Sequence, residues 1–130
     1  HFRNVMRHDV ITHDHILSIR IDESLYFANA AYLETVVYDQ IAAHQNLKHV
    51  IIMCPAVNTI DLSALEALGE INLRLIDWGI ALHLSEVKGP VMDALGRSHF
   101  LRELSGDVFL SQHVAVASLS ARESADLAPT

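Results

Sequence analysis

A carboxylate and a hydroxyl stand two residues apart where a predicted strand gives way to a predicted helix. The carboxylate belongs to Asp61 and the hydroxyl to Ser63, within the segment 58–66. The first amide groups of a helix have no partners inside the helix, and the helix dipole favours negative charge at this end. A phosphate, or a partner that recognises one, could therefore bind here, and Ser63 is a candidate phosphorylation site.

The same segment also has a purely structural interpretation. Ser63 and Glu66 have the spacing of a capping box, in which the serine accepts from the third helical amide and the glutamate reaches back. Ser63 is then the N-cap of a helix that runs to about Trp78, and it stabilises the protein by about 1 kcal/mol. The two roles are compatible, because an N-cap is also a place where a phosphate can bind.

The strands that position this segment can be predicted from the spacing of apolar residues. Alternation with a period of two predicts a strand over 17–22, and residues 10–12 could pair with it as a hairpin. Short, continuous apolar runs predict further strands at 50–53, 80–84 and 108–110. The spacing of these strands is that of strand–helix–strand units, which implies a mainly parallel sheet with right-handed crossovers.

Helices are predicted after the strands, and Asn29 and Ser63 are the expected N-caps of the first two. A third helix begins at Gly89-Pro90, and the last begins at about Gln112. In the second helix, Glu70 and Arg74 have the spacing of a favourable ion pair.

The predicted fold is α/β: a mostly parallel central sheet of about five strands, with an antiparallel edge hairpin at the N-terminus, and about four helices. Residues 1–119 form the domain. Residues 120–130 have the composition of a C-terminal tail and are expected to be partly disordered.

Three loops should lie side by side at one edge of this sheet. Ligands and partners of parallel sheets bind beyond the carboxyl ends of the strands. The loops that meet this description are residues 22–29, 54–63 and 85–89. We therefore predict a loop surface that binds a partner, an anion or a nucleotide. Its residues are Asn58, Thr59, Asp61, Ser63 and Lys88.

The composition excludes several classes of protein. The chain has 130 residues, and 51% of them are hydrophobic, which fits one folded domain. Its formal net charge of -7 makes nucleic acid an unexpected partner. The single cysteine, Cys54, follows a buried strand and indicates a reducing compartment. The longest stretch without Asp, Glu, Lys or Arg covers the 14 residues 108–121, fewer than the ~20 of a membrane-spanning helix.

Neither catalysis nor a bound cofactor is indicated. The chain contains no glycine-rich nucleotide motif, and no Gly-x-Ser-x-Gly pattern surrounds Ser63. His83 is interpreted as a residue on a strand face. The histidines and aspartates between His8 and His15 match no familiar set of metal ligands and are interpreted as a solvated turn. An enzyme, a cofactor and a metal site are therefore not expected.

Several segments resemble one known family. Residues 60–65, Ile-Asp-Leu-Ser-Ala-Leu, are similar to the Asp-Ser-Ser-Gly-Leu-type loop of STAS domains. Residues 1–5, 22–30 and 82–91 resemble segments of the C-terminal STAS domain of the sulfate permease (SulP) family, and 25–30, Leu-Tyr-Phe-Ala-Asn-Ala, is the most specific. The likeness covers about residues 1–119. This chain departs from the antagonist branch of the family at two positions, Leu62 and Ala64, where a second serine and a glycine are usual.

The resemblance implies a cytoplasmic regulatory and interaction domain of a sulfate permease-like secondary anion transporter, which acts by protein–protein contact. It also implies a position at the cytoplasmic face of the inner membrane, although the domain itself is expected to be soluble. The implied partners are the transmembrane domain of its own transporter, a second copy in a homodimer, and a regulatory protein or nucleotide.

Two alternatives remain open. The first is a free-standing anti-sigma-factor antagonist switched by phosphorylation of Ser63, since the resemblance matches Ser63 to the serine phosphorylated in that branch and Asp61 to the carboxylate beside it. A long apolar region before His1 would favour the transporter, and a start codon near His1 would favour the antagonist. The second alternative is a binder of a small ligand at the strand ends.

Overall fold

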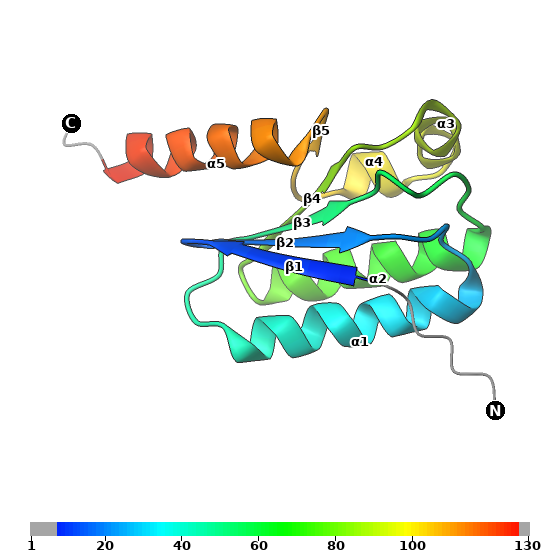
Figure 1. The fold of residues 1–130 in the computed structure, drawn as a ribbon, viewed down its shortest axis with the longest axis horizontal. Helices are drawn as coiled ribbons and strands as arrows, with labels where there is room; N and C mark the ends of the chain where they lie inside the picture. Colours follow the sequence, from blue (N-terminus) through cyan, green and yellow to red (C-terminus); the bar gives the residue numbers. More distant parts are fainter. Residues whose placement is uncertain (1–7, 128–130) are drawn as a thin grey trace.

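The computed structural model describes residues 8–127 and shows strands and helices in the predicted alternation (Figure 1). The segment 1–5 used in the family resemblance lies outside the described residues. The elements are β1 (His8–His13), β2 (Ile16–Ile21), α1 (Phe27–Ala43), β3 (His49–Met53), α2 (Leu62–Asp77), β4 (Ala81–Ser85), α3 (Gly89–Arg97), α4 (Phe100–Glu103), β5 (Val108–Phe109) and α5 (Gln112–Leu127).

The five strands form one mixed sheet in the order β1-β2-β3-β4-β5. β1 pairs with β2 antiparallel, and every other neighbouring pair is parallel. Asp14 occupies the hairpin turn with a positive φ of 49°. These observations confirm the predicted fold class, including the antiparallel hairpin at one edge. The described residues contain five helices in place of the expected four or so, because the four-residue α4 follows α3.

The two faces of the sheet bury very different amounts of apolar surface. Leu17, Ile19 and Ile21 of β2 point into the main core, to which the helices α1 and α2 also contribute. The intervening residues point to the opposite face, where α5 lies (Figure 1). There the buried apolar cluster is small and consists of Ile16, Ile51, Ala115 and Leu119. A polar sheet face under a single helix is therefore the less strongly packed half of the protein.

The N-terminus of α1 differs from the sequence prediction. The N-cap of α1 is Tyr26, and Asn29 lies three residues inside the helix. The Asn29 side chain accepts from the Tyr26 backbone N–H at 2.7 Å and donates to the Ser24 carbonyl at 2.5 Å. Asn29 therefore supports the first turn from within the helix and does not cap it.

The last helix is longer than expected. α5 continues through Leu127, so the prediction of a partly disordered tail from residue 120 is wrong for residues 120–127. Residues 128–130 lie outside the described part. Lys48 Nζ lies 3.2 Å from Glu123 Oε2, and His49 Nε2 lies 3.6 Å from Glu123 Oε1. Contacts with β3 and the residue before it therefore hold this end of α5. Between residues 8 and 127, no helix has both the length and the apolar character required to cross a membrane.

Candidate functional site

The loops after β2, β3 and β4 meet at the carboxyl ends of the parallel strands, as predicted. The Leu25 N–H donates to the Thr59 carbonyl at 3.1 Å, and the Asp61 N–H donates to the Leu25 carbonyl at 3.1 Å. The Ser24 hydroxyl accepts from the backbone amides of Asn58 and Thr59 at 3.1 and 3.3 Å. Residues 24–27, residues 58–63 and Lys88 are called the carboxyl-end corner below.

Side chains from all three loops contact one another in this corner. Lys88 Nζ donates to Asn58 Oδ1 at 2.6 Å. The Thr59 hydroxyl donates to the Tyr26 hydroxyl at 3.0 Å. Four of the five predicted loop residues therefore form one connected surface, since Asp61 also bonds to the first residue of α1. Their role in binding stays a prediction.

Asp61 caps two helices with one carboxylate. Its Oδ1 accepts from the Ala64 N–H at 2.8 Å, which makes Asp61 the N-cap of α2. Its Oδ2 accepts from the Phe27 N–H, the first amide of α1, at 3.1 Å. The prediction that Ser63 is the N-cap is wrong, because the residue two positions earlier takes that place. Asp61 also supplies the negative charge that these helix ends favour, so the corner has less need of an external anion.

Ser63 is exposed at the second position of α2. Its hydroxyl is therefore open to a kinase or a partner. Ser63 also lines a groove of about 390 Å³ between α1 and α2, which is called the acidic groove below. The lining residues of this groove are Phe27, Ala30, Ala31, Glu34, Ser63, Glu66, Ala67 and Glu70.

Large apolar side chains are exposed at the carboxyl-end corner. Phe27, the first residue of α1, is 71% exposed, and Leu62, the first residue of α2, is 70% exposed. Tyr26 beside them is 52% exposed. Apolar residues at such positions contribute little to the core, whereas a contiguous exposed group of them is typical of a protein contact surface.

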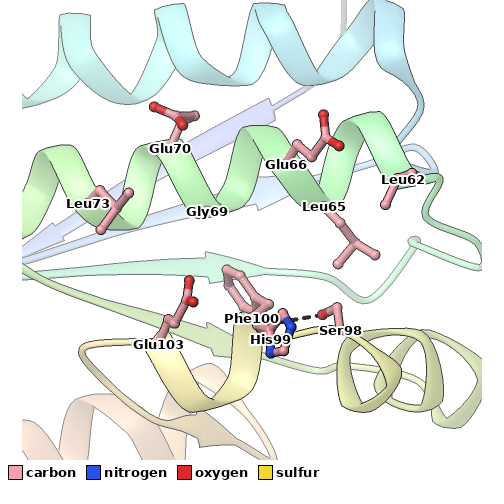
Figure 2. A pocket seen from close by; sticks show the side chains of 10 residues that line it. All are labelled: Leu62, Leu65, Glu66, Gly69, Glu70, Leu73, Ser98, His99, Phe100 and Glu103. Carbon is pink, nitrogen blue, oxygen red and sulfur yellow. Dashed lines mark hydrogen bonds between the residues drawn. The ribbon is translucent and has the colours of Figure 1, made fainter.

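A second groove, of about 260 Å³, lies on the other side of α2 against α4 (Figure 2). Leu62, Leu65 and Leu73 face it from α2, and His99 and Phe100 face it from α4 and its N-cap. In Figure 2 the side chains of Glu66 and Glu70 extend from α2 toward α1, away from Phe100. Glu66 and Glu70 line both grooves, and their side chains are directed toward the groove between α1 and α2.

The comparison with known families decides the classification. The model of one family, the STAS domain, matches residues 7–116. The chain belongs to the STAS domain family. This STAS domain is 32% identical over 114 residues to the probable sulfate transporter 3.4 of Arabidopsis thaliana. The match covers 80% of this chain and 18% of the relative, and the chain spans about a fifth of the length of each curated relative it matches.

Solved structures show that the STAS domain fold extends to distant relatives. The murine Solute Carrier 26 family member A9 anion transporter has a TM-score of 0.73 at 19% identity, over 83% of this chain and 18% of that one. A putative anti-sigma factor antagonist from Thermotoga maritima has a TM-score of 0.72 at 16% identity, over 87% of this chain and 92% of that one. At these identities the likeness concerns the fold.

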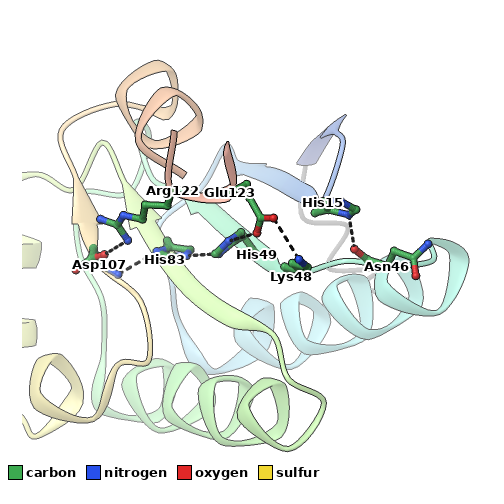
Figure 3. Close-up of polar contacts among 8 residues, drawn as sticks. All are labelled: His15, Asn46, Lys48, His49, His83, Asp107, Arg122 and Glu123. Carbon is green, nitrogen blue, oxygen red and sulfur yellow. Dashed lines mark hydrogen bonds and ion pairs between the residues drawn. The ribbon is translucent and has the colours of Figure 1, made fainter. Parts of the chain in front are cut away.

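The STAS domain also contains a hydrogen-bonded chain of two histidines that sequence reasoning missed (Figure 3). The Asp107 backbone N–H donates to His83 Nδ1 at 3.0 Å, so this nitrogen carries no proton. His83 Nε2 must then be the donor to His49 Nδ1, at 3.0 Å. His49 keeps its proton on Nε2, the nitrogen that faces Glu123 of α5. Both histidines are therefore neutral in this arrangement, which connects β4, β3 and α5.

The pKa values of both rings agree with this arrangement. Burial, followed by the neighbouring His49, lowers the pKa of His83 from its ordinary 6.5 to about 4. Burial also lowers the pKa of His49, although Glu123 opposes the change. The histidines belong to different strands, and His83 is only 1% exposed. In the sequence, the only sign of this pair is a single histidine in each of two apolar strands, His49 in β3 and His83 in β4. Whether the two histidines meet depends on the register of these strands.

Cys54 and the side chains of the histidine-rich hairpin are further groups of a type that can react or bind a metal. Burial raises the pKa of the Cys54 thiol to about 12, so the thiol stays protonated and is a poor nucleophile. Within residues 8–127, no group of three or more His, Cys, Asp or Glu side chains is arranged to hold a metal ion. In the hairpin, His13 and Asp14 pair with each other at 3.7 Å, and both side chains are exposed.

Proposed function

We propose that this STAS domain is the cytoplasmic regulatory and interaction domain of a sulfate permease-like secondary anion transporter. It acts by protein–protein contact and not by catalysis, at the cytoplasmic face of the inner membrane. Its partner is the transmembrane part of its own transporter, within a complex that can contain a second copy. The carboxyl-end corner is the surface that makes the contact.

One observation carries this proposal. At 32% identity, 80% of the chain aligns with only 18% of a protein named "Probable sulfate transporter 3.4". A domain that accounts for so small a part of its relative is expected to act on the rest of that protein. The exposed apolar side chains of Phe27 and Leu62 support contact through the carboxyl-end corner, because the Phe27 N–H donates to Asp61 and Leu62 follows Asp61 in the sequence.

The alternative is a free-standing antagonist that is switched by phosphorylation. The exposure of Ser63 at the start of α2 favours it, since a partner kinase could reach the hydroxyl. Phosphorylation there would add ~1.5 to 2 negative charges beside the Asp61 carboxylate. The likeness to a putative anti-sigma factor antagonist is a likeness of fold at 16% identity, so it does not favour this alternative over the transporter.

The proposal can be tested with the full-length gene product in proteoliposomes, with radiolabelled sulfate as the probe. Leu62→Ser removes an exposed apolar contact, and Lys88→Glu reverses the cation that bonds to Asn58. Each variant should lower the initial uptake rate severalfold. The free energy of unfolding of the 130-residue chain should change little, because surface substitutions usually alter it by less than about 0.5 kcal/mol.

Leu110→Ser is the matched control for Leu62→Ser. Leu110 is 89% exposed, follows β5, and lies outside the corner and both grooves. This control should transport sulfate at the rate of the unmodified protein. Equal rates for all variants would overturn the corner as the contact surface, and the absence of a membrane-embedded region from the gene product would overturn the transporter itself.

A further inference from the structure

The acidic groove carries three carboxylates and no cation in its lining. Glu34 comes from α1, while Glu66 and Glu70 come from α2. Glu66 and Glu70 are four residues apart on one helix, a spacing at which like charges repel each other. The groove therefore concentrates negative charge, and the repulsion between these carboxylates destabilises the folded domain.

Within residues 8–127, no cation forms an ion pair with these carboxylates. The predicted ion pair between Glu70 and Arg74 is absent from the described residues: Arg74 instead places its guanidinium over the Tyr38 ring, 5.2 Å from the ring centroid. Glu34 and Glu66 also have no ion-pair partner within residues 8–127. Burial and the charges of Glu34 and Glu70 raise the pKa of the Tyr38 hydroxyl, and the charge of Arg74 opposes this change.

The floor of the acidic groove suits a helix. Ala30, Ala31 and Ala67 line it with side chains no larger than a methyl group. Small residues between two helices allow a third backbone to approach closely, as in the packing of an amphipathic helix into a groove. Phe27 lies at one end of the lining and is 71% exposed, so it offers an apolar contact to the same visitor.

We propose that the acidic groove binds a helix that bears Lys and Arg, contributed by the cytoplasmic side of the transporter's membrane part. This inference rests on the proposed function and adds the chemistry of the partner. Cytoplasmic segments that flank membrane helices carry an excess of Lys and Arg, which complements Glu34, Glu66 and Glu70. A second copy of this chain is a poorer occupant, because each copy has a net charge of -7.

The chemistry of the groove can be tested on the 130-residue chain, which has its own core. The probe is a synthetic helical peptide with Lys on one face and Ala and Leu on the other, added during an amide NMR titration. Chemical shifts should change mainly at Ala30, Ala31, Ser63 and Ala67. Replacing Glu34, Glu66 and Glu70 together by Gln should weaken binding about tenfold, which corresponds to three exposed ion pairs of modest strength.

A triple variant elsewhere on the surface controls for non-specific attraction to an acidic protein. Asp39, Asp77 and Asp93 are exposed, lie outside both grooves, and lose the same total charge when all three are replaced by Asn. This variant should bind the peptide within about twofold of the unmodified chain. Equal losses in the two triple variants, or shifts that map away from α1 and α2, would overturn the groove as a binding site.

The source of the helix is tested in the full-length protein with a photo-cross-linking residue in place of Ala31, an exposed residue of the groove. Mass spectrometry should identify a cross-link to a Lys- and Arg-bearing cytoplasmic segment of the membrane part. A cross-link to a second copy or to another protein, or no cross-link, would overturn this occupant.

The two tests separate the inference from the proposed function. If the gene product is a transporter and the peptide ignores the groove, only the inference fails. If the gene product is a free-standing chain, the transporter function fails and the inference about the source of the helix fails with it, while the titration still decides whether the groove binds cationic helices.

Discussion

Acidification should destabilise the domain through the buried histidine pair. His83 has a pKa of about 4 in the folded protein and an ordinary value of 6.5. The unfolded chain therefore binds more protons at this residue between these two pH values, and stability falls as the pH decreases through that window. The difference of about 2.5 pKa units corresponds to about 3 kcal/mol, most of which is lost by about pH 4.5. His49 contributes in the same direction.

The geometry explains why protonation of either histidine is so unfavourable. A protonated His83 would direct an N–H at the backbone N–H of Asp107, and a protonated His49 would direct one at the N–H of His83. Either event breaks the hydrogen-bonded chain that reaches Glu123 of α5. Other charged groups surround this chain of hydrogen bonds. Lys48 and His15 face Glu123. Arg122 faces both histidines, and Asp107 faces His83.

Urea unfolding of the 130-residue chain at several values between about pH 7 and about pH 4.5 measures this effect. His83→Gln removes the titrating ring and should reduce the loss of stability over this range by about 2 kcal/mol or more. His113→Gln is the matched control, since His113 is exposed on α5, and it should follow the unmodified chain. Equal pH dependence of the unmodified chain and His83→Gln would show that protonation of His83 does not destabilise the domain.

Three further predictions concern stability and are measured by urea unfolding at neutral pH. Asp61→Ala should lower the free energy of unfolding by about 2 kcal/mol because it removes two caps. Ser63→Ala should change this free energy by less than about 0.5 kcal/mol. The reverse ranking would contradict Asp61 as the N-cap of α2. Gly106→Ala should lower the free energy of unfolding by about 2 kcal/mol, because a Cβ there would overlap His83 and the Leu82 carbonyl. Gly69→Ala is the control: its helical site is open, so the free energy of unfolding should rise by about 0.5 kcal/mol. Equal effects would be inconsistent with the close approach at Gly106. Leu119→Ala should cost about 3 kcal/mol because Leu119 is fully buried under α5, and Val114→Ala, at a half-exposed position, should cost much less.

The fold could be predicted because its local patterns agree with one another. The continuous apolar runs of β3 and β4 are typical of buried parallel strands. The alternation in β2 is typical of a strand in an edge hairpin. The juxtaposition of Asn58 and Lys88 followed from the same reasoning, since the loops after parallel strands meet at one edge.

Other features depend on contacts that a local pattern does not contain. Asp61 and Ser63 are about equally good N-caps, and the bond from Asp61 to Phe27, 34 residues away, distinguishes them only in the folded protein. The segment 120–127 has a polar composition, and its anchor is an ion pair between Glu123 and Lys48. The histidine pair likewise required the register of β3 against β4, which no single strand specifies.

The size and location of the native polypeptide decide whether this STAS domain is part of a transporter. An antibody raised against the 130-residue chain can be applied to membrane and soluble fractions of the source cells. If the domain belongs to a transporter, one band is expected in the membrane fraction at several times 14.4 kDa, since the matched relatives are about five times as long as this chain. A band near 14.4 kDa in the soluble fraction would contradict the transporter and favour the free-standing antagonist.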